Sequence, residues 1–165
     1  MQKLRPMTTN CVPGIARGII ATAAVLLLSA VTLNWANARF VAPVQNPLVA
    51  KECGACHMAY PAGLLPAASW SAIVAGLDNH FGENASVDAA TATTLKAYLT
   101  ANAERGDTRN AKTGAVALRI TELDWFLRRH GKNRLSPERL QRKGAKSAAQ
   151  CNACHKQAEQ GQFDE

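Results

Sequence analysis

The sequence is poor in several residue types that mark common functional sites. Its 165 residues include five cysteines, four histidines and three methionines, and aromatic side chains make up only 5% of the chain. No stretch alternates regularly between apolar and polar residues, so no β-strand is predicted. This absence argues against a thioredoxin-like domain, which needs a βαβ unit around its cysteines.

Four of the five cysteines lie in two C-x-x-C-H motifs. The motifs are formed by Cys53, Cys56 and His57 and by Cys151, Cys154 and His155. C-x-x-C-H is the attachment signature of a c-type haem. On a helical turn, residues three and four apart share one face, so both cysteines can reach the vinyl groups of one porphyrin while the histidine reaches the iron. The pattern predicts two covalently bound haem c groups, each with an iron.

Other roles of C-x-x-C motifs fit less well. Paired motifs can hold zinc, but they are then usually about 15–20 residues apart. Here Cys56 and Cys151 are separated by 95 positions (151 − 56). A disulfide within each motif would leave the following histidine unexplained in both copies.

Residues 1–38 are predicted to be a signal peptide. They contain three basic residues, no acidic residue and an apolar run at residues 19–33. Ala36 and Ala38 then form a small-residue cleavage signal, which predicts export. An uncleaved membrane anchor is the alternative, but the run is shorter than the roughly 20 residues that a spanning helix needs. No membrane span is expected after cleavage.

The mature chain has a modest charge and no spare cysteine. Loss of three basic residues lowers the formal net charge from +7 to +4 (7 − 3). Four haem propionates would bring the total close to zero, so a nucleic-acid partner is not expected. Cys11 leaves with the signal peptide, and no disulfide is predicted.

Basic residues are concentrated between positions 128 and 146. This segment has one acidic residue, Glu138, and eight basic ones, Arg128, Arg129, Lys132, Arg134, Arg139, Arg142, Lys143 and Lys146. A solvated face is the simplest interpretation. The functional alternatives are a docking patch for an acidic redox partner and cover for a haem propionate.

The mature chain is predicted to fold as an all-α protein. Apolar spacing indicates a helix over residues 67–78, and two prolines make residues 39–49 an extended lead-in. The other expected boundaries are an N-cap at Ser86, an N-cap at Thr121, a stop at Gly131 and a helix start at Ser136 and Pro137.

Two small haem lobes packed around covalently bound haems are the predicted architecture. The polar segment 106–114 has glycine at both ends and is the predicted linker. It divides an N-terminal haem c domain at residues 39–105 from a C-terminal haem c domain at residues 115–165.

The histidine count matches the axial positions of two irons. His57 and His155 would fill the proximal positions, and the loop at residues 60–66 is expected to offer a carbonyl to the other ring nitrogen of His57. Met58 neighbours His57 and cannot reach the opposite face of the same ring. His80 and His130 remain, so the sequence predicts bis-histidine ligation rather than the His/Met ligation of high-potential cytochromes.

A local pairing joins His57 with His80 and His130 with His155. The separations are 23 (80 − 57) and 25 (155 − 130), whereas the crossed pairing needs 73 and 75. Loop-closure entropy favours the local pairing by only about 1 kcal/mol per haem. The local pairing is therefore predicted, and the crossed pairing stays open.

Four stretches carry a family resemblance. They are CGACHMAYPAGLLP from Cys53, AGLDNHFGENA around His80, the segment from Arg119 to His130, and the closing CNACH. In these the chain resembles the dihaem cytochrome c family of phototrophic and other Gram-negative bacteria. The resemblance implies periplasmic electron transfer by two low-potential, bis-histidine haems. It also implies a small oxygen-binding monohaem cytochrome c and a membrane cytochrome b as redox partners.

Two other function classes compete with a non-enzymatic electron carrier. A dihaem peroxidase or reductase needs an open or displaceable axial position, and the mature chain is short for a substrate pocket in addition to two haems. The second competing class is a haem subunit of a larger reductase, for example the small subunit of periplasmic nitrate reductase. The two motifs of that subunit lie closer together than these.

Mass spectrometry of protein made in a host that attaches c-type haem tests the cofactor prediction. The chain cut near Ala38 should carry the mass of two haems, because each motif offers two thioether bonds. A single added haem, or haem that acid acetone extracts, would contradict it.

Overall fold

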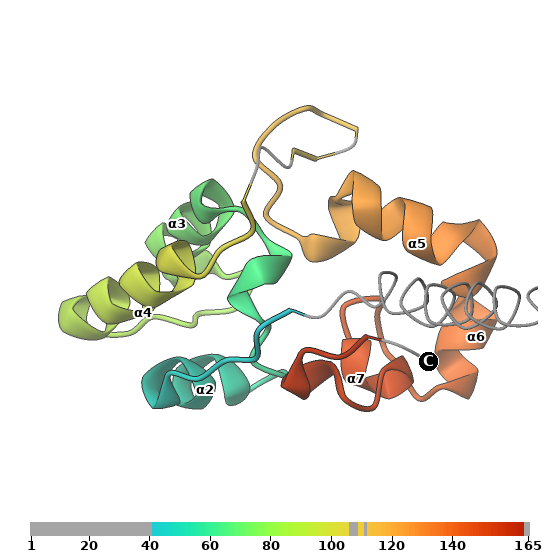
Figure 1. Cartoon of the computed structure of the whole chain (residues 1–165), viewed down its shortest axis with the longest axis horizontal. Helices are drawn as coiled ribbons and strands as arrows, with labels where there is room; N and C mark the ends of the chain where they lie inside the picture. Colours follow the sequence, from blue (N-terminus) through green and yellow to red (C-terminus); the bar gives the residue numbers. More distant parts are fainter. Residues whose placement is uncertain (1–40, 106–108, 111, 164–165) are drawn as a thin grey trace, which may run out of the picture. The chain divides into compact units, whose positions relative to one another are not determined.

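Helices joined by turns and loops form the computed structural model, which describes residues 41–105, 109–110 and 112–163 (Figure 1). The α-helices are α2 (Pro47–Gly54), α3 (Ala67–Ala75), α4 (Ala89–Ala101), α5 (Asp124–Arg134), α6 (Pro137–Arg142) and α7 (Cys151–Cys154). The 3-10 helices are η2 (Ala62–Leu64), η3 (Leu77–Asn79), η4 (Ile120–Glu122) and η5 (Ala158–Gln160). The described residues form isolated β-bridges but no strand, so the all-α class is confirmed. The predicted signal peptide lies outside them.

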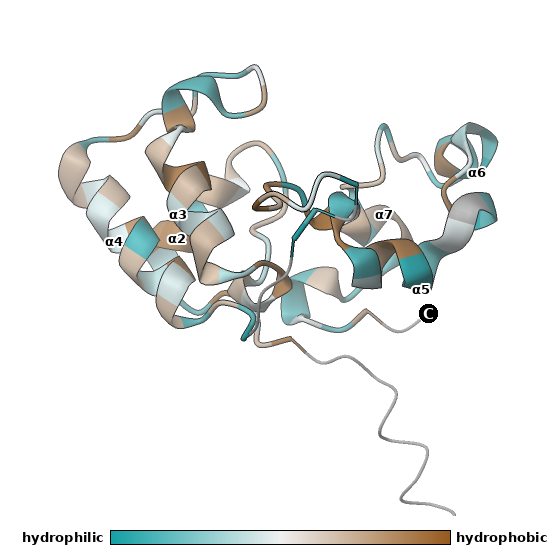
Figure 2. Ribbon diagram, turned by 90° about the horizontal axis from the view of Figure 1, so that it is seen from above, coloured by the Kyte–Doolittle hydropathy of each residue, from teal (hydrophilic) through white to brown (hydrophobic). Residues whose placement is uncertain are grey.

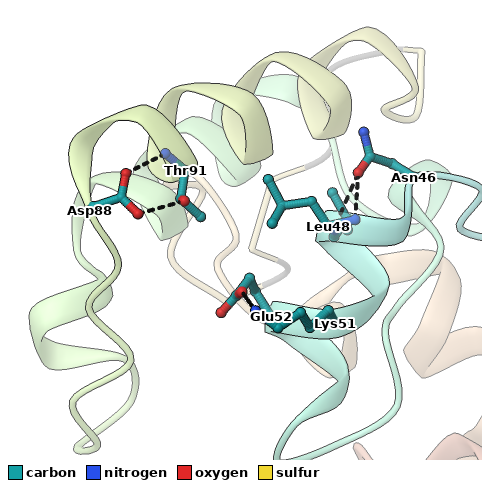
Figure 3. Close-up of polar contacts among 7 residues, drawn as sticks. Asn46, Leu48, Lys51, Glu52, Asp88 and Thr91 are labelled. Atoms are coloured by element: carbon teal, nitrogen blue, oxygen red, sulfur yellow. Dashed lines mark hydrogen bonds and ion pairs between the residues drawn. The ribbon is translucent and has the colours of Figure 1, made fainter.

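Helix α2 begins inside the stretch that was predicted to be extended. Pro47 is its first residue, and the side chain of Asn46 accepts hydrogen bonds from the backbone nitrogens of Leu48 at 2.9 Å and Val49 at 3.2 Å (Figure 3). A proline at the first helical position needs no hydrogen-bond partner for its nitrogen. The extended conformation expected for residues 39–49 was therefore wrong from Pro47 onward, because this proline starts a helix instead of preventing one.

Helices α3 and α4 pack against each other and carry much of the core. Trp70 of α3 is buried, as are Leu95 and Leu99 of α4. The N-cap of α4 is Asp88, whose carboxylate accepts hydrogen bonds from the backbone nitrogen of Thr91 at 2.9 Å and from its hydroxyl at 2.7 Å (Figure 3). The predicted cap at Ser86 was therefore wrong by two residues.

The C-terminal helices follow the predicted boundaries only in part. Thr121 lies within η4 and caps nothing, and α5 starts after Leu123 without a side-chain cap. Gly131 has non-helical backbone angles (φ 57°, ψ 170°), but helical structure resumes after it and reaches Arg134. The start of α6 was predicted correctly, since Ser136 caps it and Pro137 is its first residue.

One buried apolar cluster draws on both predicted lobes. Its N-terminal members include Val49 and Trp70, and its C-terminal members include Ala117, Leu123 and Phe126. The described residues all belong to one compact unit, Arg39–Glu165. The division into two lobes around residues 106–114 stays a prediction.

Two contacts join distant parts of the chain close to the cysteine motifs. The hydroxyl of Tyr60 donates a hydrogen bond of 2.7 Å to the carbonyl of Ala149. The backbone nitrogen of Val41 donates one of 3.0 Å to the carbonyl of Gly161. The segment before α2 is thereby fixed to the segment that follows the second motif.

No helix among the described residues is both long and apolar enough to cross a bilayer. The apolar run at residues 19–33 lies outside those residues.

Substitution of Gly161 by alanine should destabilise the fold more than the same change at Gly144. Both glycines have a left-handed backbone, with φ +77° and φ +68°, so alanine costs roughly 1–2 kcal/mol at either position. An added Cβ at Gly161 would also clash with the carbonyl oxygen of Val41, whereas at Gly144 it would meet nothing within 4 Å. Guanidinium unfolding of both holoproteins measures the difference in free energy of unfolding, and equal losses would contradict the argument.

Candidate functional site

The first cysteine motif lies at the C-terminal end of α2. Cys53 is in the last turn of the helix and half-buried, whereas Cys56 and His57 follow the helix and are exposed. Burial, followed by the neighbouring carboxylate of Glu52, raises the pKa of the Cys53 thiol. The thiol is therefore protonated at neutral pH.

His57 faces His80 across the first site. The two ring centroids are 6.2 Å apart and their planes are inclined by 29°. His80 follows η3 and is held by a tight turn, in which its nitrogen donates to the carbonyl of Glu83 at 2.7 Å. Burial, then the nearby His57 and Arg119, lower the pKa of His80. These effects favour the neutral ring, which is the form that binds a metal.

A backbone carbonyl fixes the orientation of the His57 ring. Nδ1 of His57 lies 2.7 Å from the carbonyl oxygen of Met58. A carbonyl at Nδ1 accepts a proton from that nitrogen and leaves Nε2 as the atom that can bind a metal. The expected carbonyl from residues 60–66 was wrong, because the residue directly after His57 supplies it.

The second cysteine motif forms α7 itself. The backbone nitrogen of His155 donates to the carbonyl of Cys151 at 2.8 Å, which places the histidine directly at the end of the helical turn. Burial raises the pKa of Cys151 to about 11, with a smaller contribution from the neighbouring Cys154. None of the four motif cysteines is joined to another by a disulfide, so each could form a thioether.

His130 faces His155 across the second site. Their ring centroids are 6.0 Å apart, with planes at 88°. Nδ1 of His130 lies 3.0 Å from the carbonyl oxygen of Phe126, one turn earlier in α5, and the Phe126 ring stacks on it at 4.0 Å. Phe163 contacts the other ring, with its centroid 5.7 Å from that of His155.

The spacing within both histidine pairs fits two axial ligands of one iron. A metal–nitrogen bond to imidazole is about 2 Å long and the nitrogen lies about 1 Å from the ring centroid, so two imidazoles on opposite sides of one ion have centroids roughly 6 Å apart. The measured distances are 6.2 and 6.0 Å. The structure therefore brings together the rings that the local pairing joins, and haem ligation by these four histidines stays a prediction.

A cavity of about 440 Å³ contains the whole predicted second site. Cys151, Cys154, His155 and His130 all line it, and its volume lies in the range of about 300–1,000 Å³ typical of cofactor sites. Beside the first motif lies another cavity of about 520 Å³, lined by Cys56, His57 and Met58. The two cysteines and two histidines that line the second cavity would suit a covalently attached porphyrin, whereas the cavity beside the first motif is lined by neither Cys53 nor His80.

Tyr60 connects the two sites. Its ring lies 4.9 Å from the ring of His57, and its hydroxyl donates to the carbonyl of Ala149, which also accepts from the Cys151 thiol at 3.4 Å. Burial, followed by the nearby Cys151, raises the pKa of Tyr60 to about 12, so the hydroxyl stays protonated and can donate. One aromatic side chain thus touches a predicted ligand of the first haem and the segment that holds the second.

Some residues at the sites were not singled out from the sequence. Phe126 lies four residues before His130 and shares its helix face, so helical spacing contained that signal. The contacts of Tyr60 and Phe163 depend on segments far apart in sequence, and the spacing of residues contains no comparable signal for them.

Comparison with known proteins gives consistent matches. The family model of the dihaem cytochromes c matches residues 49–163. Two solved structures of a dihaem cytochrome c from Rhodobacter sphaeroides are similar, at 48% and 46% identity with TM-scores of 0.61 and 0.63. Their matches cover 73% and 75% of this chain and 99% of theirs. A dihaem cytochrome c from Shewanella baltica OS155 is 41% identical over 73% of this chain and 89% of its own, with a TM-score of 0.60. No curated protein sequence matches.

The two ferric sites should give two different low-spin electron paramagnetic resonance signals. Near-parallel imidazole planes split the iron d-orbital energies, whereas perpendicular planes leave two of them almost equal and make the signal much more anisotropic. The inclinations of 29° and 88° therefore predict one signal of each kind. Frozen-solution spectra of the oxidised protein measure this, and a single signal shape for both irons would contradict it.

Proposed function

Because this chain belongs to the dihaem cytochrome c family, we propose that it is a periplasmic carrier that passes electrons between proteins through two low-potential, bis-histidine haems. Family membership means that it carries two haem c groups with iron and that it is a haem-based electron carrier. Each haem, when bound, exchanges one electron between ferric and ferrous iron. The histidine ligands, the low potentials, the partners and the compartment are proposed from the residues and from the family resemblance.

Ligation by four histidines is supported by the two ring pairs at 6.2 and 6.0 Å. We propose His57 and His80 for the first iron and His155 and His130 for the second, with thioethers from Cys53, Cys56, Cys151 and Cys154. Met58, the neighbour of His57, is buried and its backbone already holds that ring. Low potentials follow, because methionine ligation is what raises the potential of cytochromes c.

Two filled axial positions suit electron transfer better than catalysis on iron. A peroxidase or reductase must offer its substrate an open position on the metal. Ligands fixed by carbonyls at Nδ1, as for His57 and His130, also change little between oxidation states. The contact of Tyr60 with both sites is consistent with electron exchange between two neighbouring centres.

The compartment is proposed from the N-terminal sequence, and the partners are proposed from the family. The basic, acid-free N-terminal segment with its apolar run supports export, and covalent haem suits the periplasm. A small oxygen-binding monohaem cytochrome c as electron acceptor and a membrane cytochrome b as electron donor are proposed from the family resemblance. Redox proteins in general are the expected partners of a cytochrome c.

The variants His80→Ala and His130→Ala should each remove one axial ligand from one iron and leave the ligands of the other iron unchanged. Loss of an axial imidazole converts a six-coordinate low-spin haem into a high-spin one, which absorption and electron paramagnetic resonance spectra of the ferric protein detect. Each variant should therefore lose one of the two low-spin signals.

Added imidazole provides the control, because it should restore the low-spin state in both variants. A parent protein that is already partly high-spin would favour an enzyme over a carrier. If each variant disturbed both irons, the local pairing would be wrong.

A further inference from the structure

Four cations of the basic segment line the cavity of the second site. They are Arg129, Arg134, Arg139 and Lys143, and among the described residues, which end at position 163, no acidic residue lines the same cavity. Arg139 is half-buried and the other three are exposed. Figure 2 shows α5 with strongly hydrophilic stretches next to a hydrophobic one, as its sequence of aromatic and basic residues requires.

No ion pair within the described part of the chain neutralises these four cations. Among the described residues, the ion pairs join Lys51 to Glu52, Arg119 to Glu122 and Arg128 to Asp124, and none involves a cavity cation. Their charges therefore act on whatever occupies the cavity, subject to screening by solvent and salt.

The first site has a different electrostatic environment. The cavity beside its motif is lined by Glu159 and by no basic residue. Arg119 acts electrostatically on His80, lies 4.0 Å above the Phe81 ring and is 3.9 Å from the carboxylate of Glu122. This cation is thus paired with an acid.

The second site is also more buried than the first. Cys56 and His57 are exposed, whereas Cys154 and His155 are half-buried. The walls of the second cavity include Ile120, Trp125 and Leu140. Two propionates accompany each haem, so they add the same charge to both sites and leave the difference between the sites in place.

Charge and burial both favour the reduced state at the second site. A ferric haem carries one positive charge more than a ferrous one, so nearby cations and an apolar, desolvated cavity disfavour oxidation. We propose that Arg129, Arg134, Arg139 and Lys143 make the second site the one of higher potential, so that electrons enter at the first site and leave from the second. The proposal rests on the carrier function proposed above.

The internal step balances without a proton. One electron moves from the first site, which is oxidised, to the second, which is reduced. A one-electron donor protein re-reduces the first site, and a one-electron acceptor protein oxidises the second.

Potentiometric titration of the His80→Met holoprotein assigns the two potentials. Methionine ligation raises the potential of the iron that it binds, so the first site should move upward. The unmoved potential then belongs to the second site and should equal the higher of the two parental values. If it equals the lower value, the proposal is overturned. His130→Met is the reciprocal measurement and should leave the lower parental value in place.

Charge neutralisation tests the cause. Arg129→Gln, Arg134→Gln, Arg139→Gln and Lys143→Gln should each lower the higher potential and leave the lower one, with the largest shift for the half-buried Arg139. Arg139→Lys keeps the charge and should shift it least. Arg119→Gln should lower the potential of the first site. Lys96 is an exposed cation of α4 that lines neither cavity, so Lys96→Gln measures the background shift.

The outcomes separate this proposal from the proposed function. Cavity variants that shift the lower potential, or shift neither beyond the Lys96→Gln background, would overturn the role of the cations. A parent protein without two one-electron transitions would instead contradict the carrier function itself. High salt supplies a further check, since screening should reduce the difference between parent and Arg134→Gln.

Discussion

The spacing between paired imidazole rings is the constraint on which the rest of this structure depends. An iron with two axial histidines needs rings about 6 Å apart, and the chain holds them at 6.2 and 6.0 Å. In each pair, one ring belongs to a cysteine motif and the other to a separate part of the chain, the turn after η3 or helix α5. The helices and turns between them therefore serve to return the chain to the opposite side of the same site.

The apolar core is organised around the same requirement. Leu123 and Phe126 are buried with Trp70 and Leu99 in one cluster, although the sequence places them on opposite sides of a polar segment. Phe126 also stacks on His130 at 4.0 Å. Packing of the core and orientation of the ligands thus share residues, and a change in one would disturb the other. In a chain of this size, which buries only a moderate fraction of its surface, porphyrin rings add apolar area that side chains alone do not supply.

Features with a local signal in the sequence could be predicted, whereas contacts that depend on packing between distant segments could not. The C-x-x-C-H motifs and the start of α6 at Ser136 each depend on residues adjacent in sequence, and the count of four histidines depends on composition alone. The cap at Ser86 was predicted wrongly because Asp88, a second polar residue at the same helix start, caps α4 instead, and the cap at Thr121 was wrong because α5 starts after Leu123 without any side-chain cap. Loop-closure entropy favoured the local histidine pairing by only about 1 kcal/mol per haem, so the ring distances carry more weight than the spacing did. The contact of Tyr60 with Ala149 spans 89 positions and has no signal in either segment.

Two sites with the same ligands need not be equivalent. Both offer two cysteines and two histidines, yet Nδ1 of His57 meets the carbonyl of its own neighbour, whereas Nδ1 of His130 meets a carbonyl within a helix. These different anchors give ring planes at 29° in one pair and 88° in the other. The second site also takes its walls from α5 and α6, which contain most of the basic segment. The cysteines and histidines alone do not distinguish the two sites, so a difference between them must come from the surrounding elements, and a carrier with two identical centres would have no preferred direction for an electron.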